Sequence, residues 1–111
     1  MSGYVKLKAT LPPNDRNGLV SVAPELTRHP HELIPVIAYV DCETTTIHED
    51  TGERVPTARI RRIEPIRAKD RAAARRLLTR AIQQRTGRAE LPADVQQEID
   101  LAFETSHESE V

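Results

Sequence analysis

The most reactive side chain in this 111-residue sequence is its single cysteine, Cys42. A catalytic cysteine needs a neighbouring base and an electropositive setting that favours the thiolate. Cys42 instead stands between Asp41 and Glu43, whose negative charges disfavour a thiolate. In the alternating pattern of its segment, Cys42 shares the side that we expect to face the core. The sequence therefore predicts a small buried residue rather than a nucleophile.

The histidines do not complete a metal-binding set with Cys42. His48 lies six residues along the same expected strand, which corresponds to about 20 Å at about 3.3 Å per residue. His29 and His31 flank Pro30, and no Cys or His pair has the spacing of a zinc motif. The chain also lacks a Gly-rich phosphate loop and a nucleophile elbow. We predict no metal, no cofactor and no catalytic residue, and so a protein that is not an enzyme.

Arginine offers the most distinctive chemistry, because its guanidinium donates paired hydrogen bonds to phosphates and guanine edges. Residues 54–88 hold 12 of the 16 Lys and Arg residues but only two acids, which gives this segment a net charge of +10. Residues 1–53 carry a net charge of −4 and residues 89–111 carry −7. This sorting favours either a surface for a polyanion or a fold that neutralises its own charges.

If the basic segment binds a polyanion, nucleic acid is the ligand we expect, through arginines on a strand and bases on one helix face. The candidate nucleic-acid-binding residues are Arg59, Arg61, Arg62, Lys69, Arg76 and Arg80. No aromatic residue interrupts the basic run to stack on bases, and there is no helix-turn-helix, zinc-finger or ribonucleoprotein motif. Nucleic-acid binding is therefore the alternative function.

A long β-hairpin over about residues 33–63 is the clearest expected element. Residues 33–48 alternate and are rich in β-branched side chains, and the turn signal at residues 49–52 precedes a returning strand. A three-residue loop with Gly52 in the left-handed conformation would pair Glu49 with Glu53.

That register places opposite charges on one face of the hairpin. Glu43 faces Arg59, and Asp41 faces Arg61, while small and apolar residues pair on the other side. The arrangement predicts that the sheet neutralises part of its own basic charge.

Two helices are expected after the hairpin, over residues 68–86 and from Leu91-Pro92 to about residue 104. Residues 4–11 alternate as a first strand. Strands followed by two helices predict an α+β fold: a small antiparallel sheet with a long β-hairpin (about 33–63), covered on one face by a C-terminal helical hairpin. We expect one domain over residues 1–104 and a disordered acidic tail over residues 105–111.

A protein-binding role is the preferred function. The first strand and the returning hairpin strand leave open sheet edges that favour a partner strand or self-association. Tyr39 and Ile47 lie on the charged face of the hairpin without a core role, so they are the candidate protein-binding residues. The partner is an unidentified protein.

We expect this protein to be located in the cytoplasm. One cysteine permits no internal disulfide, and no apolar run reaches the length of a membrane span or signal peptide. The chain as a whole resembles no family. The segment 55–65 is similar to strand exits in small phage or mobile-element proteins, and the excess of Arg over Lys is typical of a high-GC bacterium. The sequence thus predicts a small accessory or adaptor protein of such an element.

Overall fold

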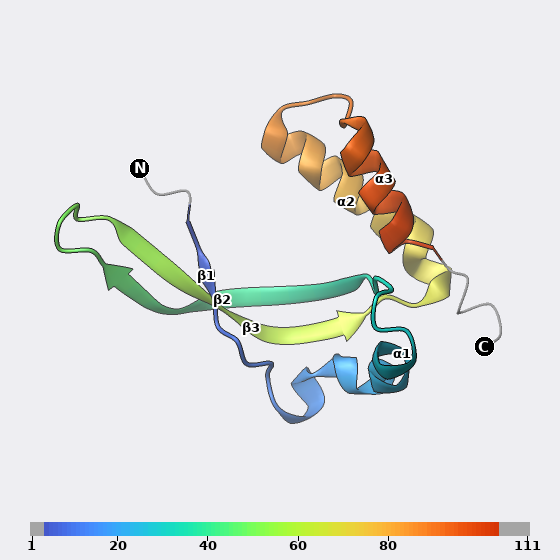
Figure 1. Cartoon of the computed structure of the whole chain (residues 1–111), viewed down its shortest axis with the longest axis horizontal. Helices are drawn as coiled ribbons and strands as arrows, with labels where there is room; N and C mark the ends of the chain where they lie inside the picture. Colours follow the sequence, from blue (N-terminus) through green and yellow to red (C-terminus); the bar gives the residue numbers. More distant parts are fainter. Residues whose placement is uncertain (1–3, 105–111) are drawn as a thin grey trace. The chain divides into compact units, whose positions relative to one another are not determined.

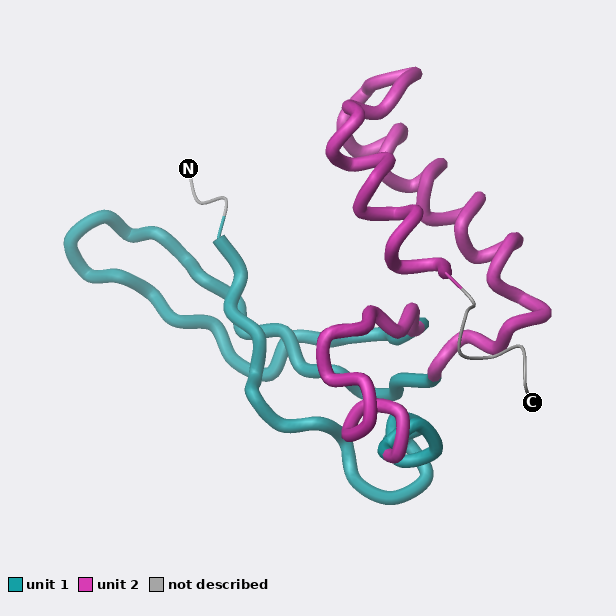
Figure 2. The backbone as a smooth tube through the Cα atoms, turned by 45° about the vertical axis from the view of Figure 1, so that its right-hand side comes forward, with its two compact units in different colours: residues 1–23, 37–64 teal, residues 24–36, 65–111 magenta. Residues whose placement is uncertain are grey.

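The structure is a computed structural model that describes residues 4–104. The chain divides into two compact units, which are described separately (Figure 2). The first consists of residues 1–23 and 37–64 and contains nearly all of the sheet; the second consists of residues 24–36 and 65–111 and contains the C-terminal helices. The expected α+β class, with a long hairpin before two helices, is confirmed (Figure 1).

The sheet has three strands in the order β1-β3-β2 (Figure 1). They are β1 (Lys6–Leu7), β2 (Val36–Ile47) and β3 (Arg54–Pro65). β1 pairs parallel with β3, so the prediction of a wholly antiparallel sheet was wrong. The returning strand β3 is central, which corrects the expectation that it forms an edge; β2 is the long edge strand instead. Alternation indicates which residues share a side of a strand, but it does not specify the neighbour or its direction.

The hairpin turn closes one residue earlier than the sequence predicted. The His48 N–H donates to the Glu53 carbonyl at 2.9 Å, and the Gly52 N–H donates to the His48 carbonyl at 2.7 Å. The loop therefore contains four residues, 49–52, rather than three. Gly52 does adopt the left-handed conformation, with φ of 74°, as expected from its position before the returning strand.

The connection from β1 to β2 crosses the end of β3 closely. It contains the 3₁₀ helices η1 (Asn14–Arg16) and η2 (Gly18–Val22), followed by α1 (Ala23–Arg28). Asn17 forms a parallel bridge with Ile63. A Cβ atom on Gly18 would lie 2.7 Å from the Ile63 carbonyl oxygen, so only glycine fits here without a shift.

The two expected helices are present, but both begin later than predicted, at Arg71 rather than residue 68 and at Ala93 rather than Leu91-Pro92. A 3₁₀ turn, η3 (Ala68–Asp70), leads into α2 (Arg71–Thr86), and α3 (Ala93–Ala102) follows. Gly87 ends α2 in the left-handed conformation with φ of 71°, and its N–H donates to the Gln83 carbonyl at 2.8 Å. Pro92 is the N-cap of α3.

Ion pairs and hydrogen bonds tie the start of α2 to the end of α3. Arg75 pairs with Asp100, and the buried Arg71 donates to the Glu104 carbonyl at 2.7 Å. These contacts set the two helices antiparallel, as the sequence predicted. Coverage of one sheet face by this pair, and a single domain over residues 1–104, stay predictions. The expected disordered tail, residues 105–111, lies outside the described residues.

Each unit has a small apolar core. Within residues 4–104, the buried apolar side chains other than proline are Val55 and Ile63 in the first unit and Leu91 and Ile99 in the second. Many other large apolar side chains are exposed, including several on β2. No helix among the described residues is both long enough and apolar enough to cross a membrane.

Candidate functional site

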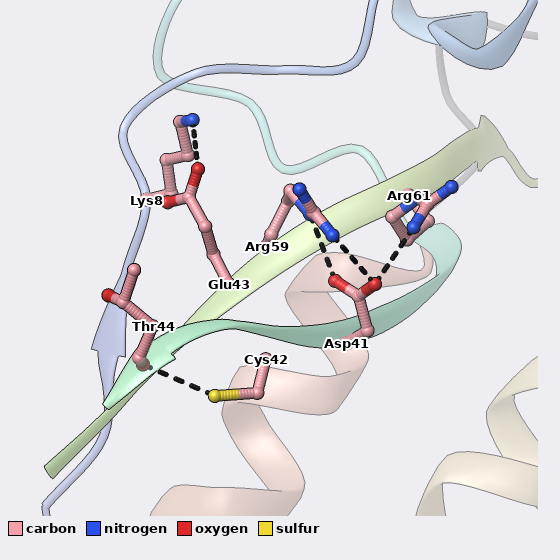
Figure 3. A network of polar contacts seen from close by, with 7 residues as sticks. All are labelled: Lys8, Asp41, Cys42, Glu43, Thr44, Arg59 and Arg61. Carbon is pink, nitrogen blue, oxygen red and sulfur yellow. Dashed lines mark hydrogen bonds and ion pairs between the residues drawn. The ribbon is translucent and has the colours of Figure 1, made fainter.

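The hairpin carries a compact ion-pair cluster around the Asp41 carboxylate (Figure 3). Arg59 binds it through two hydrogen bonds, from Nε to Oδ1 at 3.0 Å and from Nη2 to Oδ2 at 2.9 Å. Arg61 Nη1 donates to the same Oδ2 at 2.8 Å. The predicted pairing of Asp41 with Arg61 is confirmed, and Asp41 also takes the arginine that the sequence assigned to Glu43.

The two guanidinium groups change how Asp41 titrates. Hydrogen bonds from Arg59, and then from Arg61, lower the pKa of Asp41 from 3.8 to about 2. The hydrogen bond to Asp41 in turn raises the pKa of Arg59. With one carboxylate and two guanidinium groups, the cluster of Asp41, Arg59 and Arg61 retains one surplus positive charge.

Glu43 pairs with a lysine that the sequence analysis did not consider. Lys8 follows β1, and its Nζ forms an ion pair with Glu43 (Figure 3). The Lys8 N–H also donates to the Ala58 carbonyl at 2.9 Å, which holds this part of the chain beside β3. The carboxylate of Glu43 thus pairs with Lys8 rather than with Arg59, because the parallel strand β1 brings Lys8 to the same side of the sheet. The predicted position of Glu43 opposite Arg59 stays a prediction.

Arg62 has several partners within the first unit. Its Nε donates to the Tyr39 hydroxyl at 3.3 Å, and its Nη atoms contact Asp15 and Glu64 at 3.2 and 3.3 Å. The bond to Tyr39, followed by that to Asp15, raises the pKa of Arg62. All three strand arginines proposed as nucleic-acid contacts, including Arg62, are thus bonded to side chains of their own unit.

The helical candidates differ from the strand arginines. Lys69, Arg76 and Arg80 are exposed, and none of them forms an ion pair with another residue in the range 4–104. The acidic helix α3 contributes Asp100 to Arg75 instead. The six nucleic-acid candidates therefore separate into an engaged strand group and an exposed helical group, each in its own unit.

β2 exposes apolar side chains along its length. The two predicted protein-binding residues, Tyr39 and Ile47, are each 56% exposed. Ile37 and Val40 are 59% and 57% exposed. Sequence reasoning missed Val40 because it assigned that side of the strand to the core, and it did not single out Ile37, which shares the side of Tyr39 and Ile47. The available signal for Ile37 was its place in the alternation, on the same side as Tyr39 and Ile47. Val40 had no such signal, because strand order is not visible in the sequence.

Cys42 is exposed, so its assignment as a buried core residue was wrong. Its Sγ lies 3.2 Å from the Thr44 carbonyl oxygen and points away from the arginines of the ion-pair cluster (Figure 3). At the edge of the sheet, Cys42 has a neighbouring strand on one side only.

Among the described side chains, no group of three or more His, Cys, Asp and Glu residues is arranged to hold a metal ion. Comparisons with known proteins found no family model, no curated protein and no solved structure that matches this chain.

Proposed function

We propose that this chain is a small, non-enzymatic, cytoplasmic accessory protein that acts by binding another protein chain through β2. The observation that supports this proposal is the exposure of large apolar side chains on the edge strand, with Tyr39 and Ile47 more than half exposed. Full burial of one such side chain contributes about 1.5–3 kcal/mol. A partner that covers several of them therefore gains affinity without any catalytic group.

The hairpin fits protein better than nucleic acid. Phosphate binding requires arginines that can exchange their present partners for phosphate oxygens. Arg59 and Arg61 already share the Asp41 carboxylate. A phosphate would have to displace that carboxylate, whereas an apolar contact at Ile47 requires no such exchange. Tyr39 also offers an amphipathic ring, a common type of interface anchor.

Site-specific photo-crosslinking tests this proposal. A photoreactive phenylalanine analogue placed at Tyr39 or Ile47 should form covalent adducts with a protein partner in the native host. The same analogue at Gln84, on exposed α2, is the matched control. We expect adducts of one defined mass from positions 39 and 47 and none from position 84.

The apolar contact is then removed. For this test the photoreactive analogue is placed at Ile37, where it should also form the adduct. Tyr39→Ser with Ile47→Ser should abolish that adduct, while far-ultraviolet circular dichroism stays unchanged. If positions 39 and 47 give no adduct under conditions in which the chain is folded, β2 is not a protein-binding surface and the proposal is wrong.

Nucleic-acid binding through α2 is the second candidate function. It is favoured by the exposed helical group of Lys69, Arg76 and Arg80, which has no ion pair among the described residues. Arg76→Gln with Arg80→Gln should remove about two phosphate contacts to random duplex DNA. The slope of the logarithm of the binding constant against the logarithm of the salt concentration should fall accordingly. Arg59→Gln with Arg61→Gln removes the same charge but should leave that slope unchanged. Absence of binding at low salt in fluorescence anisotropy would exclude this candidate.

A further inference from the structure

We infer that β2 pairs antiparallel with β2 of a second copy of this chain, across a two-fold axis at Cys42. The two three-stranded sheets would then form one continuous sheet. This inference deepens the proposed function by naming the partner, and it rests on the same exposed strand.

The edge strand β2 is long and carries few of the features that protect edges against strand pairing. Natural edge strands are kept short or carry proline, lysine or bulges that prevent edge-to-edge association. The other edge of this sheet follows that rule, because β1 has only two residues. β2 has twelve residues and contains no Pro, Lys or Arg. Its two acids, Asp41 and Glu43, are bonded to Arg59 and Lys8 of their own sheet.

Two-fold symmetry restricts the register. A closed dimer of antiparallel strands needs an axis perpendicular to the sheet, so one residue faces its own copy. Near the middle of β2 the choices are Asp41, Cys42 and Glu43. An axis at Asp41 sets two clusters with surplus positive charge against each other. An axis at Glu43 sets two carboxylates directly opposite, which is destabilising.

The axis at Cys42 gives the best charge match. It places Glu43 of one copy opposite Asp41 of the other. Asp41 brings the surplus positive charge of Arg59 and Arg61, and Glu43 brings a carboxylate already paired with Lys8, so no two like charges lie directly opposite each other. The side of β2 that carries Cys42 is uncharged in this stretch, since Val40 and Thr44 are its neighbours on that side of the strand.

Cys42 reports on this register directly. Residues opposite each other in antiparallel strands have Cα atoms about 4.5–5.5 Å apart, within the range of about 4.4–6.8 Å that a disulfide spans. Copper(II)–phenanthroline should take one electron from each of two Cys42 thiols, with release of two protons, to give a disulfide-linked dimer. Dithiothreitol should return the dimer to the 12.5 kDa chain.

A shifted cysteine is the matched control. In Cys42→Ser with Thr44→Cys, the two new thiols lie four residues apart along the strand direction, or about 13 Å. This variant should form at least about tenfold less disulfide dimer than the natural chain under equal conditions. Equal yields from both chains would mean random collision and would overturn the register.

Sedimentation equilibrium in reducing buffer tests the dimer without covalent chemistry. The natural chain should show twice its monomer mass. Val40→Lys introduces a charge on the exposed edge strand and should weaken dimerisation at least about tenfold, or about 1.4 kcal/mol. Thr44→Lys is a second edge variant with the same expected effect, in case Val40→Lys reduces folding as judged by circular dichroism.

A monomer at about 100 µM for the natural chain overturns this inference. Such a monomer that still forms photo-adducts with a different protein from positions 39 and 47 leaves the proposed function intact. A monomer that forms no adduct at either position means that both are wrong.

Discussion

At the scale of single residues, Asp41 is the best-bonded carboxylate of the hairpin. It accepts three hydrogen bonds from Arg59 and Arg61 at 2.8–3.0 Å. A carboxylate that accepts charged hydrogen bonds is held in its ionised form, which is why its pKa falls to about 2. The same bonds fasten two strands of the sheet to each other at a point where no large apolar residue is buried.

The lowered pKa of Asp41 makes stability depend on pH in a defined direction. Because the pKa is lower in the folded chain than the ordinary 3.8, the ionised group stabilises the fold above pH 3.8. That stabilisation is lost as the pH falls from about 4 towards 2. We expect Asp41→Asn to melt at a lower temperature than the natural chain at pH 7, with the difference becoming much smaller as the pH falls to about 2.

Thermal unfolding followed by circular dichroism between pH 7 and pH 2 checks this expectation. Asp15→Asn is the matched control, because Asp15 is highly exposed and bonds only to Arg62 among the interactions described. A difference between natural chain and Asp41→Asn that stays constant over this pH range would contradict the assignment.

At the scale of elements, local patterns predicted more than long-range partners. Alternation located the hairpin, and the Gly87 signal located the end of α2, because both depend on residues close in sequence. The partner of Glu43 could not be predicted in the same way. Lys8 lies 35 residues away, and its position depends on the parallel pairing of β1, which leaves no mark in the pattern of β1 itself.

The buried side assigned to β2 was wrong for a related reason. Both sides of β2 carry apolar residues. The sequence analysis assumed that only one side faces solvent, and it therefore assigned the other side to the core. Val40 and Cys42 are exposed because β2 is an edge strand, and edge position is a property of strand order. The candidate residues Tyr39 and Ile47 were expected to be exposed, and they are.

Gly87 gives a prediction about α2. Its φ of 71° is in the left-handed region, where a side chain costs about 1–2 kcal/mol. Gly87→Ala should therefore lower the free energy of unfolding by about 1 kcal/mol in urea titration. Gly87→Asn should lower it less, because asparagine adopts this conformation more readily. Equal losses in the two variants would show that backbone conformation is not the cause.

At the scale of the whole molecule, the sparse buried core has a consequence for stability. Besides two prolines, four buried apolar side chains in the described part of the chain contribute little against the entropy of ordering the backbone. A chain of this kind gains stability when association covers its exposed apolar residues.

The proposed dimer therefore predicts a melting temperature that depends on protein concentration. Raising the concentration from about 1 to about 100 µM should increase the melting temperature of the natural chain by several degrees. The edge variant Val40→Lys should show a smaller increase between the two concentrations, because its dimer is weaker. Differential scanning calorimetry in reducing buffer makes the comparison, and a concentration-independent transition in the natural chain would contradict the prediction.

The parallel pairing of β1 with β3 also orders events in time. Lys6 pairs with Thr57, which a ribosome adds about fifty residues later, or about 3–10 s later at about 5–20 residues per second. The hairpin closes a short loop and can form as soon as it is released, whereas β1 must wait for the strand it joins. We therefore expect the first strand to be synthesised to enter the sheet last, so that the Lys8–Glu43 ion pair marks completed folding.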